Sequence, residues 1–340
     1  MNDITVRGSK AGNIISRIVR LDQFALALCL LLLWILMAML SPVFLTATNI
    51  LNLFRQSSMV GIASLGMCLI VLSGEIDLSI APMQAAVGVI VVYLLNKTGS
   101  LFLAFFAGLA AGVLVSAMIA ALVTKGNIAS LIVTLGMASV VKGVVLVVTN
   151  SASIQNSNNS LAWIGTGYIG PIPVPIILFL VLIIVFYLFL NRTIYGRNFY
   201  AIGGNQNAAR LSGLNVIRYK FSAFIIGGLM SALAAIILTS RLNSGQPTAG
   251  TGFEMQVISA VVLGGVSLNG GRGTLPGVII GVFILSTLQN GLTLLNVNSF
   301  YQELIRGVVL LLAVYLDGRK MHIKPNRRKE LHAENTRGES

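Results

Sequence analysis

The sequence predicts an all-α fold, a polytopic membrane bundle of about ten transmembrane helices. Of the 340 residues, 56% are hydrophobic and only 10% are charged, whereas a soluble domain carries about 25% charged residues. Apolar runs close to the ~20 residues that cross a bilayer recur from end to end. Lys and Arg gather in alternate loops, which is typical of membrane proteins oriented by their cytoplasmic charges.

The apolar runs place ten spans along the chain. They lie near 23–41, 58–73, 79–95, 101–124, 128–149, 174–190, 221–239, 255–268, 275–295 and 301–317. The first run follows basic residues and is longer than the core of a signal peptide, so we expect a retained span. The eighth is short for a bilayer crossing, and we expect it to be tilted or to be broken by Gly264 and Gly265.

The basic residues predict the orientation. With the N-terminus in the cytoplasm, eighteen of the 23 Lys and Arg residues lie inside and three outside, while Lys142 and Arg306 fall within or beside spans. This distribution follows the positive-inside rule and predicts that both termini are cytoplasmic, in a multi-pass protein of the inner membrane. Topology therefore accounts for the net charge of +13, and we expect membrane lipid, not nucleic acid, around the chain.

This topology divides the chain into three parts. We expect a cytoplasmic N-terminal tail at 1–22, a transmembrane domain at 23–317 and a cytoplasmic C-terminal tail at 318–340, much of it disordered. The longest inside loop of the transmembrane domain runs over 191–220. The outside segment at 150–173 is polar, then rich in Gly and Pro, and carries no charge.

The inside loop predicts a short capped helix. Asn205 is suited to an N-cap, and Gly213 to the left-handed position after a helix end. About two helical turns fit between them, and the segment has these residues: Gly203, Gly204, Asn205, Ala208, Ala209, Arg210, Leu211 and Gly213. Such a helix is either a docking element for a cytoplasmic partner or an ordinary connector on the membrane surface, and the loop alone favours neither.

Several charges lie in or near spans, where charge is costly and often functional. Glu75 and Asp77 sit at the inside end of the second span, where they could cap the next helix or take part in gating. Lys142 falls in mid-span and could line a cavity. Glu303 and Arg306 are three residues apart, so we expect them to pair on one helix face.

The chain offers no sign of catalysis or of a cofactor of its own. No Lys directly follows a Gly, so the phosphate-binding motif G-x-x-x-x-G-K-[S/T] is absent. Cys29 and Cys68 lie inside apolar runs, and we expect neither a disulfide nor a metal site. No nucleophile–base pair suggests an enzyme.

Three stretches carry a resemblance to a known family. They are Leu72-Ser-Gly-Glu-Ile-Asp-Leu-Ser79, then Thr193-Ile-Tyr-Gly-Arg-Asn-Phe-Tyr-Ala-Ile-Gly-Gly-Asn205 continuing as Ala208-Ala-Arg-Leu-Ser-Gly213, and Val262-Leu-Gly-Gly-Val-Ser267 with Gly270-Gly-Arg-Gly-Thr274 and Asn290-Gly-Leu292. From about Pro42 to Asp317 the chain resembles the permease subunits of bacterial ribose-type ABC importers. It departs from their pattern at Glu75 and at Ile80-Ala-Pro82.

The resemblance implies an ABC importer permease fold and a role in ATP-driven import of a monosaccharide by alternating access. It implies three kinds of partner: a cytoplasmic ATPase that binds ATP and Mg²⁺, an external sugar-binding protein, and a second permease subunit, identical or not. It also implies that the 203–213 helix couples the permease to the ATPase, while Glu75, Asp77, Gly264 and Gly265 remain candidates for gating or structure.

Two alternatives remain open. A secondary carrier driven by an ion gradient would use charges in or near spans, namely Glu75, Asp77, Lys142 and Glu303. A permease for branched-chain amino acids would keep the architecture and change the cargo. The sequence does not name the sugar.

Overall fold

The computed structural model describes residues 9–322 of the chain, which form a helical bundle with two short two-stranded sheets. Its elements, in chain order, are α1 (Ser9–Leu40), α2 (Ala47–Leu72), α3 (Ile80–Thr98), α4 (Leu101–Thr124), α5 (Ser130–Thr149), β1 (Ile154–Gln155), η1 (Asn159–Leu161), α6 (Ala162–Thr166), β2 (Tyr168–Ile169), β3 (Ile172–Pro173), α7 (Val174–Arg192), α8 (Ile194–Gly204), α9 (Gln206–Leu211), α10 (Val216–Leu242), β4 (Ser244–Gly245), α11 (Phe253–Leu263), α12 (Leu275–Leu294) and α13 (Ser299–His322). The all-α membrane fold is confirmed.

Each of the ten predicted spans coincides with one helix. Within the described residues, eight helices are long and apolar enough to cross a membrane. The predicted boundaries move at both ends of the chain, because α1 begins at Ser9 and α13 continues to His322. The remaining parts of the predicted tails, 1–8 and 323–340, lie outside the described residues.

The eighth predicted span is a broken one. Its helix, α11, has 11 residues, about 16 Å at the usual rise of 1.5 Å per residue, which is half of a ~30 Å hydrocarbon core. Gly264 ends the helix, its N–H bonding to the carbonyl of Ala260. Gly265 then turns the chain with a φ of +86°, in the left-handed region that favours glycine.

The centre of the bundle is the crossing of α2 and α10. A Cβ built on Gly66 would lie 2.8 Å from the Cα of Gly227, so the two backbones touch. On its other sides α10 packs against α3 and α4, and a Cβ on Gly112 would lie 2.6 Å from the Cβ of Ala232. Small residues therefore set the distances between these helices, as expected for packing in lipid.

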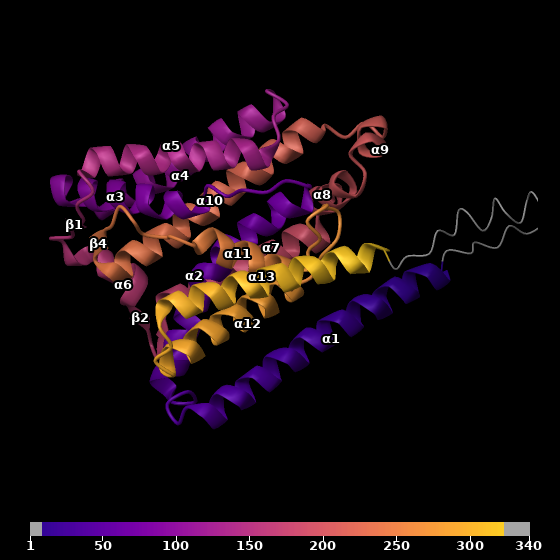
Figure 1. Cartoon of the computed structure of the whole chain (residues 1–340). Helices are drawn as coiled ribbons and strands as arrows, with labels where there is room; N and C mark the ends of the chain where they lie inside the picture. The colour runs from indigo at the N-terminus through magenta and orange to yellow at the C-terminus, as the bar shows by residue number, and fades with distance from the viewer. Residues whose placement is uncertain (1–8, 323–340) are drawn as a thin grey trace, which may run out of the picture.

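The first helix lies at the edge of this bundle (Figure 1), where it packs against α12. Two side-chain hydrogen bonds attach it there. The indole N–H of Trp34 donates to the hydroxyl of Thr287 at 3.0 Å, and the amide of Gln23 donates to the hydroxyl of Thr274 at 2.8 Å.

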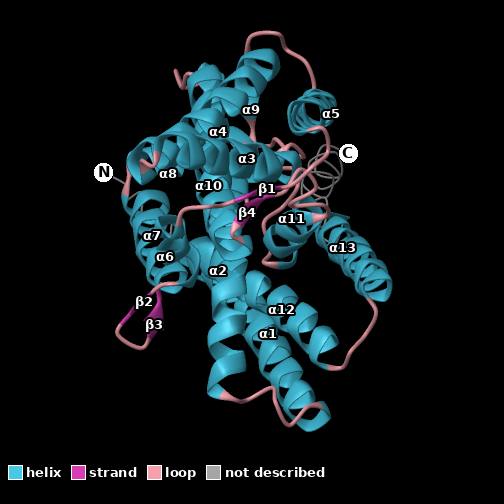
Figure 2. Ribbon diagram, turned by 90° about the vertical axis from the view of Figure 1, so that its left-hand side faces the viewer, coloured by secondary structure: helices cyan, strands magenta, loops and turns pink. Residues whose placement is uncertain are grey.

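The two ends of the bundle differ in kind. One end carries α8 and α9, and the opposite end carries β1, β4, α6 and β2 (Figure 1); we call them the α9 end and the β1 end. At the β1 end, Ile154 pairs with Gly245, which joins the segment 150–173 to the chain leaving α10. Figure 2 shows α5 standing apart from α13, with α11 packed beside α13.

Candidate functional site

The short helix expected in the 191–220 loop forms at the α9 end with the predicted caps. The side-chain oxygen of Asn205 accepts from the backbone N–H of Ala208 at 2.9 Å, and Gly213 follows the helix with a φ of +82°. The helix itself is shorter than the predicted 203–213, at six residues. Gly203 and Gly204 belong instead to the end of α8, because Asn205 can cap α9 only from outside the helix.

A junction of glycine backbones lies beneath this helix. It joins the end of α2, the end of α8 and the turn between α11 and α12, and we call it the glycine junction. The N–H of Gly271 donates to the carbonyl of Leu72 at 3.0 Å. A Cβ on Gly203 would lie 1.8 Å from that same carbonyl oxygen, and a Cβ on Gly271 would lie 2.3 Å from the amide nitrogen of Gly204. No larger residue fits these positions unless the backbones separate.

The junction unites the three stretches that carry the family resemblance. Gly74 of the first stretch lies against Gly270 of the third, where a Cβ on Gly270 would come 2.8 Å from the Gly74 nitrogen. Gly203, from the second stretch, also lies next to Gly270, whose added Cβ would come 3.0 Å from the Gly203 Cα. The turn that follows α2 and the turn that follows α11 are therefore neighbours in space.

A charged side chain connects the end of α2 to the start of α9. The ammonium of Lys220, on α10, lies 2.6 Å from the carboxylate of Glu75 and 3.0 Å from the side-chain oxygen of Gln206. Both ionic side chains are 13% exposed. Lys220 therefore pairs within the chain and does not project toward a partner. Glu75 pairs across the junction and does not cap α3.

Asp77 holds the turn that leads into α3. Its carboxylate accepts from the backbone N–H of Ser79 at 2.8 Å and from the Ser79 hydroxyl at 2.6 Å. Burial raises the pKa of Asp77, and the two hydrogen bonds from Ser79 oppose that rise. The Asp77 carboxylate thus accepts hydrogen bonds within its own turn, and these bonds fix the local backbone.

Gly264 and Gly265 mark the other turn. A Cβ on Gly264 would lie 2.6 Å from the carbonyl oxygen of Gly277, so α11 and α12 make backbone contact at this point. Gly265 has open space around it, so glycine is needed at this position only because the backbone has a positive φ. The two glycines therefore serve different needs, close packing and chain reversal.

The apolar residues of α9, Ala208, Ala209 and Leu211, do not form a single face that a partner could contact. Ala209 is 5% exposed and packs against Ile202 and Val216 of its own chain, while Leu211 is 90% exposed. At 100° per residue, Ala209 points away from the face that Ala208 and Leu211 share.

Two side chains at the α9 end have roles that the sequence did not predict. The hydroxyl of Tyr200 donates to the carbonyl of Gly273 at 3.3 Å, and burial raises its pKa, which keeps it a donor. The carboxylate of Asp317 accepts from the N–H of Leu268 at 3.3 Å. Tyr200 lies three residues before Gly203, within a stretch already singled out. No sequence signal connects Asp317 with the turn that it holds.

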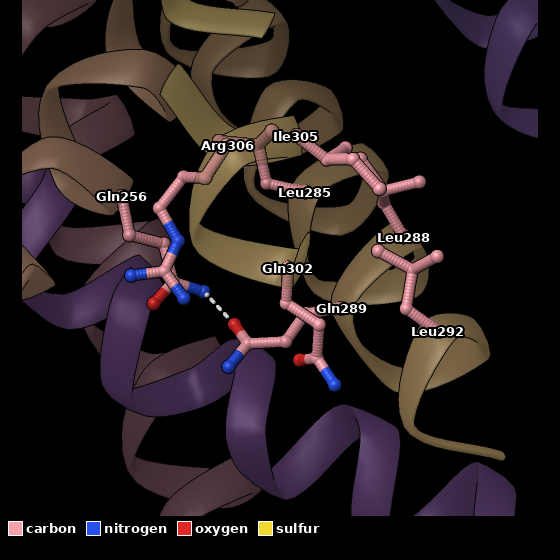
Figure 3. Close-up of a pocket in the computed structure, with 8 residues that line it drawn as sticks. All are labelled: Gln256, Leu285, Leu288, Gln289, Leu292, Gln302, Ile305 and Arg306. Carbon is pink, nitrogen blue, oxygen red and sulfur yellow. Dashed lines mark hydrogen bonds between the residues drawn. The ribbon is translucent and has the colours of Figure 1, made fainter. Parts of the chain in front are cut away.

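The expected pair of Glu303 and Arg306 is absent from the described residues. Arg306 instead points inward and donates to the carbonyl of Gly252 at 3.3 Å, at the start of α11. It lines a small cavity in which Gln256, Gln289 and Gln302 face leucine and isoleucine side chains (Figure 3), and Gln256 donates to Gln289 at 2.8 Å. The volume is about 20 Å³, enough for a single water molecule and too small for a sugar.

Comparison with known proteins places these features in context. The model of a family described as "Branched-chain amino acid transport system / permease component" matches residues 49–314. The ribose import permease protein RbsC of Bacillus subtilis (strain 168) is 43% identical over 293 residues, 86% of this chain and 91% of the relative. That of Escherichia coli (strain K12) is 39% identical over 297 residues, 86% and 92% of the two chains.

A third relative has another sugar in its name. The L-arabinose transport system permease protein AraH of Escherichia coli (strain K12) is 39% identical over 303 residues, 89% of this chain and 92% of the relative. No solved structure matches the chain significantly. The similarity to the permeases covers the glycine junction, α9 and almost all of the helical bundle.

Proposed function

This chain belongs to the family described as the permease component of branched-chain amino acid transport systems, and we propose that it imports a monosaccharide as the membrane subunit of an ABC transporter. The observation that carries this proposal is the likeness to ribose and arabinose permeases over 86–89% of the chain. The chain is a transporter subunit and not an enzyme, and ATP hydrolysis belongs to a separate ATPase.

Transport proceeds by alternating access in this proposal. ATP binding and hydrolysis on the ATPase move a contact on the permease between two arrangements. The proposed contact is α9, because its exposed residues project beyond the glycine junction. Movement of α9 reaches α2 through Lys220 and Glu75 and reaches the α11–α12 turn through Gly203 and Gly271. Because the backbones are in direct contact, a displacement of one segment also moves its neighbour.

The remaining partners follow from the same function. We assign the β1 end to the outside of the membrane, where a sugar-binding protein docks, and the α9 end to the cytoplasm, because Arg192, Arg197, Arg210 and Arg218 lie near α9. A second permease subunit, identical or related, completes the pathway. ATP and Mg²⁺ bind to the ATPase alone.

The test is association and uptake. A tagged form of this chain, purified in mild detergent from its own host, is expected to bring down an ATPase. Deletion of its gene is expected to abolish ATP-dependent uptake of labelled D-ribose, L-arabinose or a related monosaccharide, with restoration by the wild-type gene. Uptake that survives ATP depletion and collapses with the ion gradient would instead identify a secondary carrier.

The description of the family supports one other cargo, a branched-chain amino acid. Labelled leucine and valine therefore belong in the same uptake assay. Loss of leucine uptake with retention of all sugar uptake after gene deletion would assign the chain to amino acids. The relatives with sugars in their names favour the opposite result.

A further inference from the structure

A cleft opens between α5 on one side and α3 and α11 on the other. Its volume is about 240 Å³, twelve times that of the small cavity around Gln256. The polar groups that line it are Ser139, Lys142, Thr248, Thr251 and Glu254. Apolar residues, among them Pro82 and Met255, complete the wall. The cleft is distinct from the glycine junction and from the small cavity around Gln256.

The two charges in this cleft have no partner that satisfies them. Among the described residues, neither Lys142 nor Glu254 forms an ion pair. One carboxylate oxygen of Glu254 is buried and accepts no hydrogen bond, although the positive charges of Arg306 and Lys142 attract it. Charged side chains within a membrane usually face a water-filled cavity and mark a substrate pathway.

The cleft lies near the middle of the membrane. Lys142 is twelve residues after Ser130 and seven before Thr149, the ends of α5, which places it ~18 Å and ~10 Å from them at 1.5 Å per residue. Opposite it, non-helical backbone over 246–252 leads into the half-length helix α11. Non-helical backbone at this depth is tolerated where it is buried or lines water, and broken helices near the midplane form substrate sites in other transporters.

We propose that Lys142 and Glu254 are the pair that binds sugar hydroxyls as the monosaccharide crosses the membrane, an assignment that rests on the function proposed above. A sugar hydroxyl both donates and accepts, so it can accept from the ammonium and donate to the carboxylate. Ser139 and Thr251 add neutral partners, and Pro82 and Met255 face the C–H surface of the ring. On its other faces α5 packs mainly against α3 and α4.

Cysteine labelling tests whether water and sugar reach the cleft. The chain carries Cys29→Ser and Cys68→Ala together with either Ser139→Cys or Val140→Cys. The assembled complex is isolated through a tag on this chain and placed in lipid nanodiscs. The neighbours on α5 differ in direction: Ser139 lines the cleft, while Val140, which is 59% exposed, lies about 100° around the helix. A charged methanethiosulfonate should modify position 139 at least ~10-fold faster, because thiolate forms only where water reaches.

Millimolar D-ribose or L-arabinose, whichever the wild-type complex imports, should slow labelling at position 139 severalfold. Equal rates at 139 and 140, or no labelling at 139, would overturn the proposed cleft. Labelling that the imported sugar does not slow would leave the proposed function intact and refute the sugar site. A wild-type complex that imports no sugar would refute the proposed function, while the labelling ratio would still report on the cleft.

Uptake by charge-removal variants gives a second measurement. Lys142→Met and Glu254→Gln should each reduce sugar uptake at least ~10-fold, the effect of losing about 1.4 kcal/mol of interaction, without reducing ATPase association. The matched controls remove the same charges elsewhere: Lys97→Met and Glu303→Gln, both exposed outside the cleft. Uptake at wild-type rates in both cleft variants would contradict the proposal.

Discussion

The carbonyl of Leu72 and the backbone N–H of Gly271 form a hydrogen bond of 3.0 Å, which ties the end of α2 to the turn between α11 and α12. Gly203 lies against the same carbonyl. One oxygen atom is thus the meeting point of three segments that are far apart in the chain. Because α9 begins two residues after Gly204, a force on α9 acts directly on this point.

The glycine junction should be intolerant of one extra methyl group. Gly203→Ala places a Cβ 1.8 Å from the Leu72 oxygen, and we expect it to destabilise the fold by about 1–3 kcal/mol, the usual range for overpacking. Gly204→Ala is the matched control, because a Cβ there meets nothing within 4 Å. Thermal unfolding in detergent measures both. Equal melting temperatures for the two variants would refute the tight contact.

The pair formed by Lys220 and Glu75 should be energetically coupled. Glu75→Gln and Lys220→Met each leave a largely buried charge without its partner, and we expect each to cost about 1–3 kcal/mol. In a double-mutant cycle, the double variant should lose less than the sum of the single losses. Additive losses would show that the two side chains do not interact.

Contact with the ATPase should depend on Leu211 and not on Ala209. Leu211→Asp changes a side chain that is 90% exposed, so we expect normal insertion and melting temperature with loss of ATPase co-purification and of uptake. Ala209→Asp buries a charge against Ile202 and Val216, so it should lower the yield of folded protein. Wild-type association and uptake in Leu211→Asp would exclude α9 as the link.

Asp77 should act on the turn and not on sugar choice. Asp77→Ala removes the acceptor of two hydrogen bonds from Ser79, and we expect a loss of about 1–3 kcal/mol or a matching fall in folded yield. Asp77→Asn keeps an acceptor oxygen and should retain more stability. Competition among sugars for uptake checks specificity, and an altered preference in Asp77→Asn would contradict this role.

The orientation predicted from charge is testable with two cysteines in the background free of Cys29 and Cys68. Ser157→Cys lies in an exposed part of the β1 end, and Ser340→Cys is the last residue of the chain. An impermeant reagent applied to intact spheroplasts should label position 157 and leave position 340 unlabelled until the membrane is opened. Labelling of both from the same side would refute the ten-span topology.

Local signals were sufficient for much of the site. Asn205 and Gly213 were assigned to the two ends of a helix, and the structure shows both caps, because capping depends on neighbouring backbone groups. The eighth span was expected to be either tilted or broken, and the structure shows that it is broken. A break could be expected because the two glycines that end the helix are adjacent in the sequence. The partner of Lys220 could not be predicted, because Glu75 is 145 residues away.

The sequence by itself determined the fold class, the order of the helices and the residues that end them, because lipid selects apolar runs of a certain length and helix ends depend on local backbone hydrogen bonds. Only the tertiary structure decided that Leu72, Gly203 and Gly271 meet, that Ala209 faces inward while Leu211 faces outward, and that Lys142 and Glu254 share a cleft. These relations depend on how helices from distant parts of the chain pack, and in a membrane small residues permit many close packings. The combined packing of all the helices decides which of these close packings forms.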